Sequence, residues 1–171
     1  KQWKRWNEAF IRPGIQPERW INRNNMTAWG LVVTKSKLNP EIDEISLYSS
    51  EAYYTEKNRL RRFTIRMDGF VSINATKQGQ FITHPVIFDG DNFVLNYSTS
   101  AAGFIKVEIQ DLEGKPIENY SIDDCLEIYG DSIEEKVRWK NEDDVSKLKG
   151  RPVRLKFLMK DADLYSIRFK N

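Results

Sequence analysis

Apolar and polar residues alternate with a period of two along most of the chain, which is the pattern of β-strands rather than helices. The clearest example is residues 104–111, where Ile105, Val107 and Ile109 are separated by charged residues. One apolar face and one polar face in each strand is typical of antiparallel sheets, which pack a single face on the core. The same alternation predicts further strands at residues 60–67, 93–99, 153–160 and 165–169.

Turn-forming residues separate these predicted strands. Asp-Gly pairs stand at residues 68–69 and 89–90, and Gly114 can adopt the positive φ that tight turns need. Several short strands divided in this way indicate a sandwich or a jelly roll. The sequence therefore predicts an all-β fold, an antiparallel β-sandwich of jelly-roll-like type.

One short helix is predicted at residues 145–149. Asp143 or Asp144 can cap its N-terminus, and Gly150 followed by Pro152 ends it. Other stretches lack the periodicity of a helix, so the predicted fold class is all-β with one short helix.

Charge is distributed unevenly, although the whole chain carries only +2. Residues 1–39 contain eight Lys or Arg, two acidic residues and four of the five Trp, a net charge of +6, whereas residues 40–171 carry −4. Such a difference indicates two segments of different character, which we divide into 1–44 and 45–171. The chain opens at Lys1 with neither a Met nor an apolar signal segment, as expected of a trimmed product.

The composition narrows the function. With 171 residues, of which 40% are hydrophobic, the chain can build one packed domain and an additional segment. One cysteine, Cys125, excludes an intrachain disulfide and a zinc site built from several cysteines, and one histidine, His84, disfavours a hydrolytic triad. The near-neutral charge disfavours a nucleic-acid partner, and no apolar run reaches the roughly 20 residues of a membrane span.

Acidic residues concentrate in residues 119–146, which contain nine Asp or Glu. Two of them could act as the acid and base of a glycosidase, with Asp131 and Glu135 as the pair to test, or all could belong to a solvated loop. Clustered carboxylates also suit calcium, for which Asp123, Asp124 and Asp131 are the candidate ligands, although their spacing does not match an EF-hand. No other cofactor is predicted.

Two aromatic residues near these acids are candidates for binding a glycan. Trp139 stands between two basic residues after a strand-like stretch, and Tyr129 precedes Gly130 and Asp131. Aromatic rings can stack on the faces of sugars, while Asp131 could accept hydrogen bonds from sugar hydroxyls. The alternative for Trp139 is that it fills the core of the sandwich.

The chain also contains a set of short runs that belong together: residues 60–72, 96–103, 107–111, 128–132, 139–140, 150–157 and 160–166. This set resembles the C-terminal β-sandwich module of bacterial glycoside-hydrolase-like proteins, in which the module follows a five-bladed β-propeller. Arg12-Pro13-Gly14, Trp20-Ile21-Asn22-Arg23 and Trp29-Gly30 resemble the last strands of such a propeller.

The resemblance implies a non-catalytic β-sandwich module of a secreted or periplasmic carbohydrate-active protein, the parent being a glycoside hydrolase. The module would brace an upstream catalytic domain of the same chain or contact a polysaccharide or oligosaccharide. No catalytic residue carries over to this sequence from the resemblance. Two alternatives remain open, a glycosidase that uses Asp/Glu pairs within residues 123–144, and an immunoglobulin-like adhesion or assembly domain.

Overall fold

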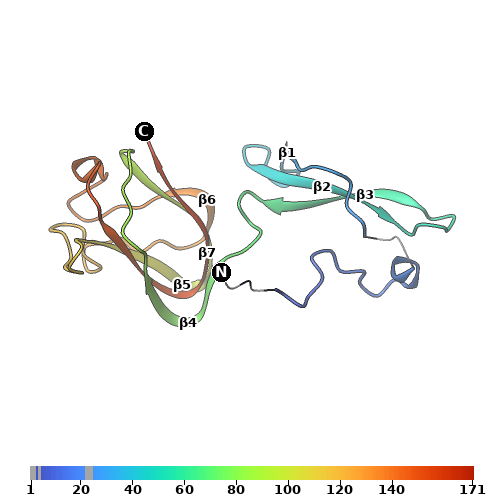
Figure 1. Cartoon of the computed structure of the whole chain (residues 1–171), viewed down its shortest axis with the longest axis horizontal. Coiled ribbons are helices and arrows are strands. Elements are labelled where there is room, and N and C mark those ends of the chain that lie inside the picture. Colours follow the sequence, from blue (N-terminus) through green and yellow to red (C-terminus); the bar gives the residue numbers. More distant parts are fainter. Residues whose placement is uncertain (1–2, 4, 22–24) are drawn as a thin grey trace. The chain divides into compact units, whose positions relative to one another are not determined.

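The computed structural model describes residues 3, 5–21 and 25–171 (Figure 1). This described part is all-β, with two antiparallel sheets, two 3₁₀ helices and no α-helix. The chain divides into two compact units, Lys1–Met67 and Asp68–Asn171, each of which contains one sheet. The predicted all-β class is confirmed. Asn22 and Arg23, two of the residues compared with propeller strands, lie outside the described residues.

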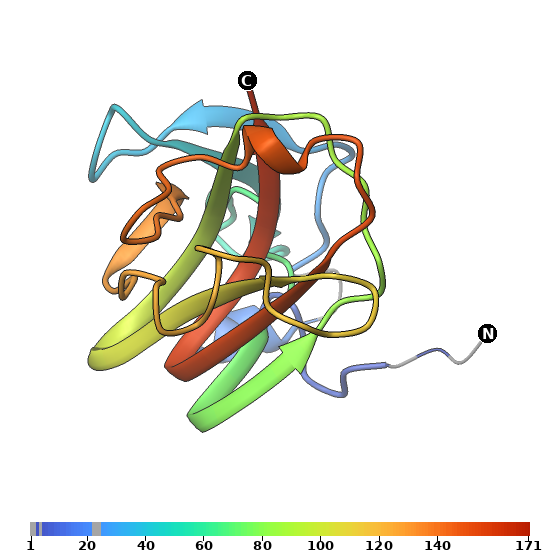
Figure 2. The same cartoon turned by 90° about the vertical axis from the view of Figure 1, so that its left-hand side faces the viewer.

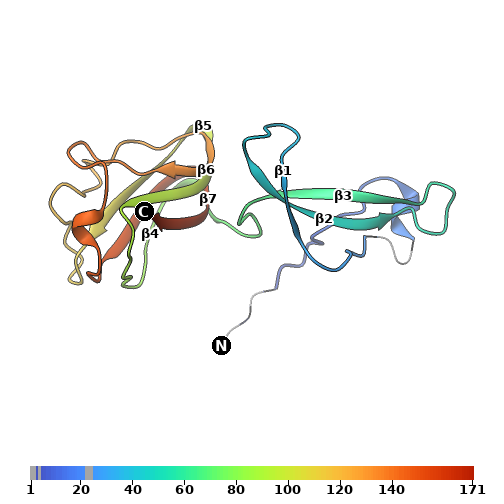
Figure 3. The ribbon, with the colours of Figure 1, turned by 90° about the horizontal axis from the view of Figure 1, so that it is seen from above.

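The first unit contains a three-stranded meander, seen edge-on in Figure 3. Leu47 of the central strand pairs with Phe63 of the third strand, so apolar side chains of neighbouring strands share a face. The third strand is the one predicted at residues 60–67. In the order of the sheet, the strands are β1 (Val32–Lys35), β2 (Asp43–Glu51) and β3 (Arg59–Arg66).

Few apolar side chains of the first unit are buried. Among its described residues they are Ile45, Leu47 and Ala52, whereas Trp20 and Trp29 are among the large apolar side chains that are exposed. Residues 1–67 carry thirteen Lys or Arg and seven acidic residues, a net charge of +6, so residues 68–171 carry −4. The division into residues 1–44 and 45–171 was predicted from charge and composition, and it stays a prediction.

The second unit is built on a four-stranded antiparallel sheet in which two strands are long (Figure 2). The strands predicted at 93–99 and 104–111 are the two halves of one strand, and those predicted at 153–160 and 165–169 are the halves of another. In the order of the sheet, the strands are β4 (Ile73–Ile82), β7 (Arg154–Lys170), β5 (Asn92–Gln110) and β6 (Asp131–Lys136).

Sharp bends fold this sheet back on itself, which produces the sandwich-like form of the second unit (Figure 2). The register between β5 and β7 shifts between Thr99 and Phe104, where the strands turn. Gly103 lies at this point, and a Cβ added there would come within 2.3 Å of the carbonyl oxygen of Asp161. The close approach of the two backbones explains why a glycine stands at the bend.

One hydrophobic core fills the space between the folded halves. It includes Phe93 and Leu95 from the first half of β5, and Val107 and Ile109 from the second half. Phe93 also stacks on Phe169 of β7, with ring centroids 4.7 Å apart. Burial of each large apolar side chain contributes about 1.5–3 kcal/mol, so this core stabilises the bent sheet.

The helical segments are short. The 3₁₀ helix Ser146–Leu148 lies inside the stretch predicted as a helix, so the position is confirmed while the type is 3₁₀. The predicted cap was wrong, since Val145 occupies the N-cap position; Asp144 still accepts a hydrogen bond of 3.0 Å from the amide of Ser146. Gly150 follows with a φ of +68°, as expected where a helix ends. The other 3₁₀ helix is Pro17–Trp20.

Candidate functional site

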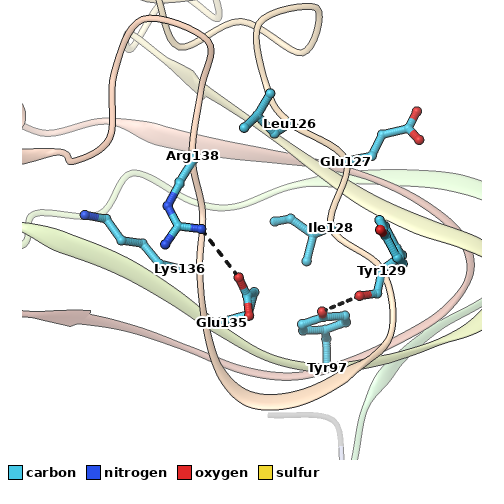
Figure 4. Close-up of a pocket in the computed structure, with 8 residues that line it drawn as sticks. All are labelled: Tyr97, Leu126, Glu127, Ile128, Tyr129, Glu135, Lys136 and Arg138. Atoms are coloured by element: carbon cyan, nitrogen blue, oxygen red, sulfur yellow. Dashed lines mark hydrogen bonds and ion pairs between the residues drawn. The ribbon is translucent and has the colours of Figure 1, made fainter.

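A pocket of about 350 Å³ opens on the second unit between the segment 126–129 and the region of β6 (Figure 4). Its volume lies in the range of small-ligand sites, and its lining combines apolar, aromatic and charged groups, as such sites do. The lining residues are Tyr97, Leu126, Glu127, Ile128, Tyr129, Glu135, Lys136 and Arg138.

Backbone hydrogen bonds attach one wall of the pocket, the segment 126–129, to neighbouring parts of the chain. Ile128 and Ile105 of β5 exchange two of them, at 2.8 and 3.0 Å, and the amide of Leu126 donates to the carbonyl oxygen of Arg138 at 3.0 Å. The segment 126–129 is thus held on both sides. A segment held in this way can present its side chains in fixed positions.

Tyr97 lies beneath the segment and holds it by its side chain. Its hydroxyl donates a hydrogen bond of 2.8 Å to the carbonyl oxygen of Tyr129. Burial, with smaller contributions from Glu135 and Asp131, raises the pKa of Tyr97 to about 12. The hydroxyl therefore remains protonated at neutral pH and keeps its role as donor.

Tyr129 offers an aromatic ring to solvent at the edge of the pocket. The side chain is 73% exposed, although its backbone is fixed by Tyr97. The next residue, Gly130, has a φ of +106°, donates to Thr99 Oγ1 at 2.9 Å and accepts from the Thr99 amide at 2.7 Å. A rigid backbone beneath an exposed ring lowers the entropy lost when a ligand stacks on it.

Two acidic and two basic side chains line the pocket. Arg138 and Glu135 point toward one another, with Nη1 and Oε1 3.8 Å apart, and both are about half exposed (Figure 4). Lys136 and Glu127 point outward in the same view, and Glu127 lies 3.6 Å from Lys106. The Arg138–Glu135 distance exceeds that of a hydrogen bond, so this ion pair is loose.

Trp139, predicted to stack on a glycan, lies in the core instead. Its side chain is 1% exposed, its indole nitrogen donates to the carbonyl oxygen of Val107 at 3.0 Å, and its ring meets that of Tyr120 edge-on. A ring buried in this way offers no face to a ligand. The alternative from the sequence, in which Trp139 fills the core of the sandwich, is the one that the structure shows.

The other two predicted glycan contacts lie nearer the pocket. Tyr129 lines it, whereas Asp131, the first residue of β6, is exposed opposite Ser98 and does not line it. The carboxylates that do line the pocket are Glu127 and Glu135. Tyr129 is thus the one member of the predicted set that contributes a face to the pocket.

The predicted calcium ligands are not gathered around a common point. Asp124 accepts a hydrogen bond from the hydroxyl of Ser121 at 2.7 Å, and Asp123 is exposed. Within residues 3, 5–21 and 25–171, no three His, Cys, Asp or Glu side chains come together as a group able to hold a metal ion. Asp123, Asp124 and Asp131 therefore do not form such a group in this structure.

Several carboxylates of the acidic stretch have cations or hydroxyls as partners. Glu134 binds Lys170 at 2.7 Å and Arg168 at 2.9 Å, and these contacts, the Lys170 hydrogen bond first, lower its pKa. Hydrogen bonds from Ser146 lower the pKa of Asp144. A general acid in glycoside hydrolysis needs a raised pKa, and neither of these two carboxyls has one.

Sequence reasoning did not identify Tyr97, Glu127 or Arg138 as pocket residues. A sequence signal for Arg138 exists: because Val137 and Trp139 face the core, alternation along the chain places Arg138 on the outer face. The contribution of Tyr97 depends on its contact with Tyr129, a residue distant in the sequence, and no local pattern reveals such a contact.

No protein-family model matches the chain, and neither a curated protein nor a solved structure matches it. The resemblance to a glycoside-hydrolase-associated module therefore stays a prediction. In the part of the chain that the structure describes, no helix is both long enough and apolar enough to cross a membrane.

Proposed function

We propose that the second unit is a non-catalytic β-sandwich that binds carbohydrate in the pocket between segment 126–129 and β6. The observation that carries the proposal is a pocket lined both by the exposed ring of Tyr129 and by the loose pair of Glu135 and Arg138. Sugars have apolar C–H faces and many hydroxyls, so a ring together with a charged donor and a charged acceptor matches both features.

A binding role fits the pocket better than hydrolysis. Hydrolysis requires one carboxyl with a raised pKa and a second at a defined separation. Glu135 instead faces the guanidinium of Arg138, with Nη1 and Oε1 3.8 Å apart, so the neighbour of this carboxyl is a cation rather than a second carboxyl. These features support recognition of a sugar rather than cleavage of its glycosidic bond.

In the larger context that the sequence suggests, the chain would serve a secreted or periplasmic bacterial carbohydrate-active protein. Its partners would be a polysaccharide or oligosaccharide and a catalytic domain that precedes residue 1. Nucleic acid is disfavoured as a partner of the second unit, whose net charge is −4, since phosphate binding requires positive charge.

A glycan array of plant and host polysaccharides, followed by calorimetry of the hits, tests the binding role. Tyr129→Ala should weaken the affinity about 10-fold or more, because burial of an aromatic side chain contributes about 1.5–3 kcal/mol. Tyr54→Ala is the matched control, since Tyr54 has a similar exposure, 67%, and lies in the other unit. Failure of the native chain to bind any glycan would end the proposal.

A second candidate function is that of an assembly domain, and the exposed apolar side chains of the first unit favour it. Trp20, Trp29 and Leu38 are exposed there, and few side chains form a core. Exposed apolar surface of this kind marks association, and the opposite charges of the two units favour contact between unlike units of two copies. Light scattering during gel filtration at several concentrations and salt levels checks this, and a monomer under all conditions contradicts it.

A further inference from the structure

Acidic and basic side chains line the pocket in equal number, which bears on the charge of the ligand that it would take. Two are acidic, Glu127 and Glu135, and two are basic, Lys136 and Arg138, so the lining carries no net charge. Arg138 and Glu135 lie only 3.8 Å apart, so a ligand carboxylate that gained from Arg138 would also lie near Glu135, and an ammonium group would meet the reverse arrangement. Like charges at such short range oppose binding of both kinds of ligand.

The loose ion pair is also suited to admit a hydroxyl. Its 3.8 Å separation is longer than a hydrogen bond, and both side chains are about half exposed. Exposed pairs of this type contribute only about 0–1 kcal/mol, so separating them costs little. A hydroxyl both donates and accepts, and it can therefore donate to Glu135 and accept from Arg138 at the same time.

We propose that the pocket binds an uncharged sugar, with one hydroxyl bridging Glu135 and Arg138 and the ring stacked on Tyr129. This inference rests on the proposed carbohydrate-binding function and assigns its ligand class, a neutral saccharide rather than a uronic acid or an amino sugar. Ile128 and Leu126 line the same pocket, and their apolar side chains suit the C–H groups of the sugar.

Calorimetry with three sets of oligosaccharides tests the ligand class. The neutral probes are cello-, xylo- and malto-oligosaccharides, the acidic probe is an oligogalacturonide, and the basic probe is a chitosan oligosaccharide. We expect the native chain to prefer a neutral probe, with an affinity that changes little as sodium chloride is raised. Preference for the oligogalacturonide or the chitosan oligomer would overturn the inference while leaving the carbohydrate-binding function intact. Failure of every probe, and of the glycan array, would overturn both.

Charge-changing variants test the bridge itself. Glu135→Gln should weaken neutral-sugar binding by about 10- to 100-fold, since a hydrogen bond to a charged group contributes about 1.5–3 kcal/mol. It should also improve oligogalacturonide binding, because the pocket then carries net positive charge. Arg138→Gln should have the opposite preference and improve binding of the chitosan oligomer.

Glu113→Gln is the control for these variants, since it removes the same charge from an exposed turn that does not line the pocket. It should leave all affinities unchanged. Thermal unfolding of each variant verifies that the chain is folded during the titrations. Unchanged neutral-sugar affinity in a folded Glu135→Gln would rule out the bridging hydroxyl.

Discussion

The buried hydroxyl of Tyr97 donates a hydrogen bond of 2.8 Å to the carbonyl oxygen of Tyr129, whose own ring lies in solvent. One tyrosine thus anchors the backbone of another across 32 positions of sequence. The anchor belongs to β5 in the core, and the anchored residue borders the pocket. This contact, together with the backbone hydrogen bonds of Ile128 and Gly130 to β5, therefore links core packing to the position of the candidate binding ring.

Replacement of this anchor should affect stability and binding together. Tyr97→Phe keeps the buried ring and removes the donor, so we expect a loss of about 1 kcal/mol in unfolding free energy. We also expect glycan affinity to fall about 5-fold, because the carbonyl of Tyr129 is no longer held and ordering the segment then opposes binding. Urea unfolding and calorimetry measure the two effects.

Tyr120→Phe is the matched control for the anchor. Tyr120 is equally buried, burial raises its pKa to about 12 as it does for Tyr97, and its hydroxyl donates to the carbonyl oxygen of Asp144 at 3.0 Å. This variant should lose a similar amount of stability without losing affinity. Equal affinity losses in both variants would mean that general loosening, rather than the contact to Tyr129, lowers binding.

Trp139 should behave as a core residue. Trp139→Ala should reduce the unfolding free energy by about 3–5 kcal/mol, the usual cost of removing a large buried aromatic side chain. Trp139→Phe retains most of the apolar volume and should cost less, leaving the glycan affinity of the folded protein unchanged. Tyr129→Ala should show the reverse pattern, with stability altered by at most about 0.5 kcal/mol. Urea titrations and calorimetry on the three variants provide the comparison.

The sandwich was predictable because its core residues follow a strict alternation. Ile105, Val107 and Ile109 were predicted to face inward, and all three are fully buried. What could not be predicted is that the two halves of β5 form one strand. Residues 100–103, Ser-Ala-Ala-Gly, have the composition of a turn, and only the approach of Asp161 to Gly103 reveals a bent strand.

The pocket was less predictable, because its walls come from segments that meet through the register of the sheet. Tyr129 stood out from the sequence as an aromatic residue beside a glycine. Glu135 was singled out from the sequence only as one half of a candidate acid–base pair with Asp131, and its relation to Arg138 depends on how the chain continues from β6 toward the core residue Trp139. Sequence patterns identify faces of strands, whereas a pocket depends on which faces meet.

Glu51 should make the first unit sensitive to acid. Burial raises the pKa of Glu51, but hydrogen bonds from Arg61 and Arg59, both at 2.6 Å, outweigh it and hold the pKa below its usual value. A lowered pKa in the folded state stabilises the unit above the unfolded value of 4.5, and this contribution is lost as the pH falls below it. We expect unfolding of the first unit to become easier in that acidic range.

Amide hydrogen exchange in β2 and β3 can follow this transition, because the four Trp of residues 1–39 are exposed and their fluorescence would change little on unfolding. Glu51→Gln should remove the acid dependence and cost about 1.5–3 kcal/mol at neutral pH, since the buried arginine Arg19 also loses its carboxylate partner at 2.8 Å. Glu56→Gln, at an exposed position of the same unit, should change neither property. An acid transition that persists unchanged in Glu51→Gln would assign it to other carboxyls.

Gly103 should be required for the bend that folds the sheet of the second unit. In Gly103→Ala the new Cβ would lie 2.3 Å from the carbonyl oxygen of Asp161, a backbone atom that cannot move aside without disturbing β7. Overpacking of this kind costs about 1–3 kcal/mol, which urea unfolding will measure. Gly79→Ala is the control, because its Cβ would meet only the Cβ of Ala75 at 3.8 Å, an ordinary contact. If Gly103→Ala were as stable as Gly79→Ala, the two long strands could not approach as closely at the bend as the structure describes.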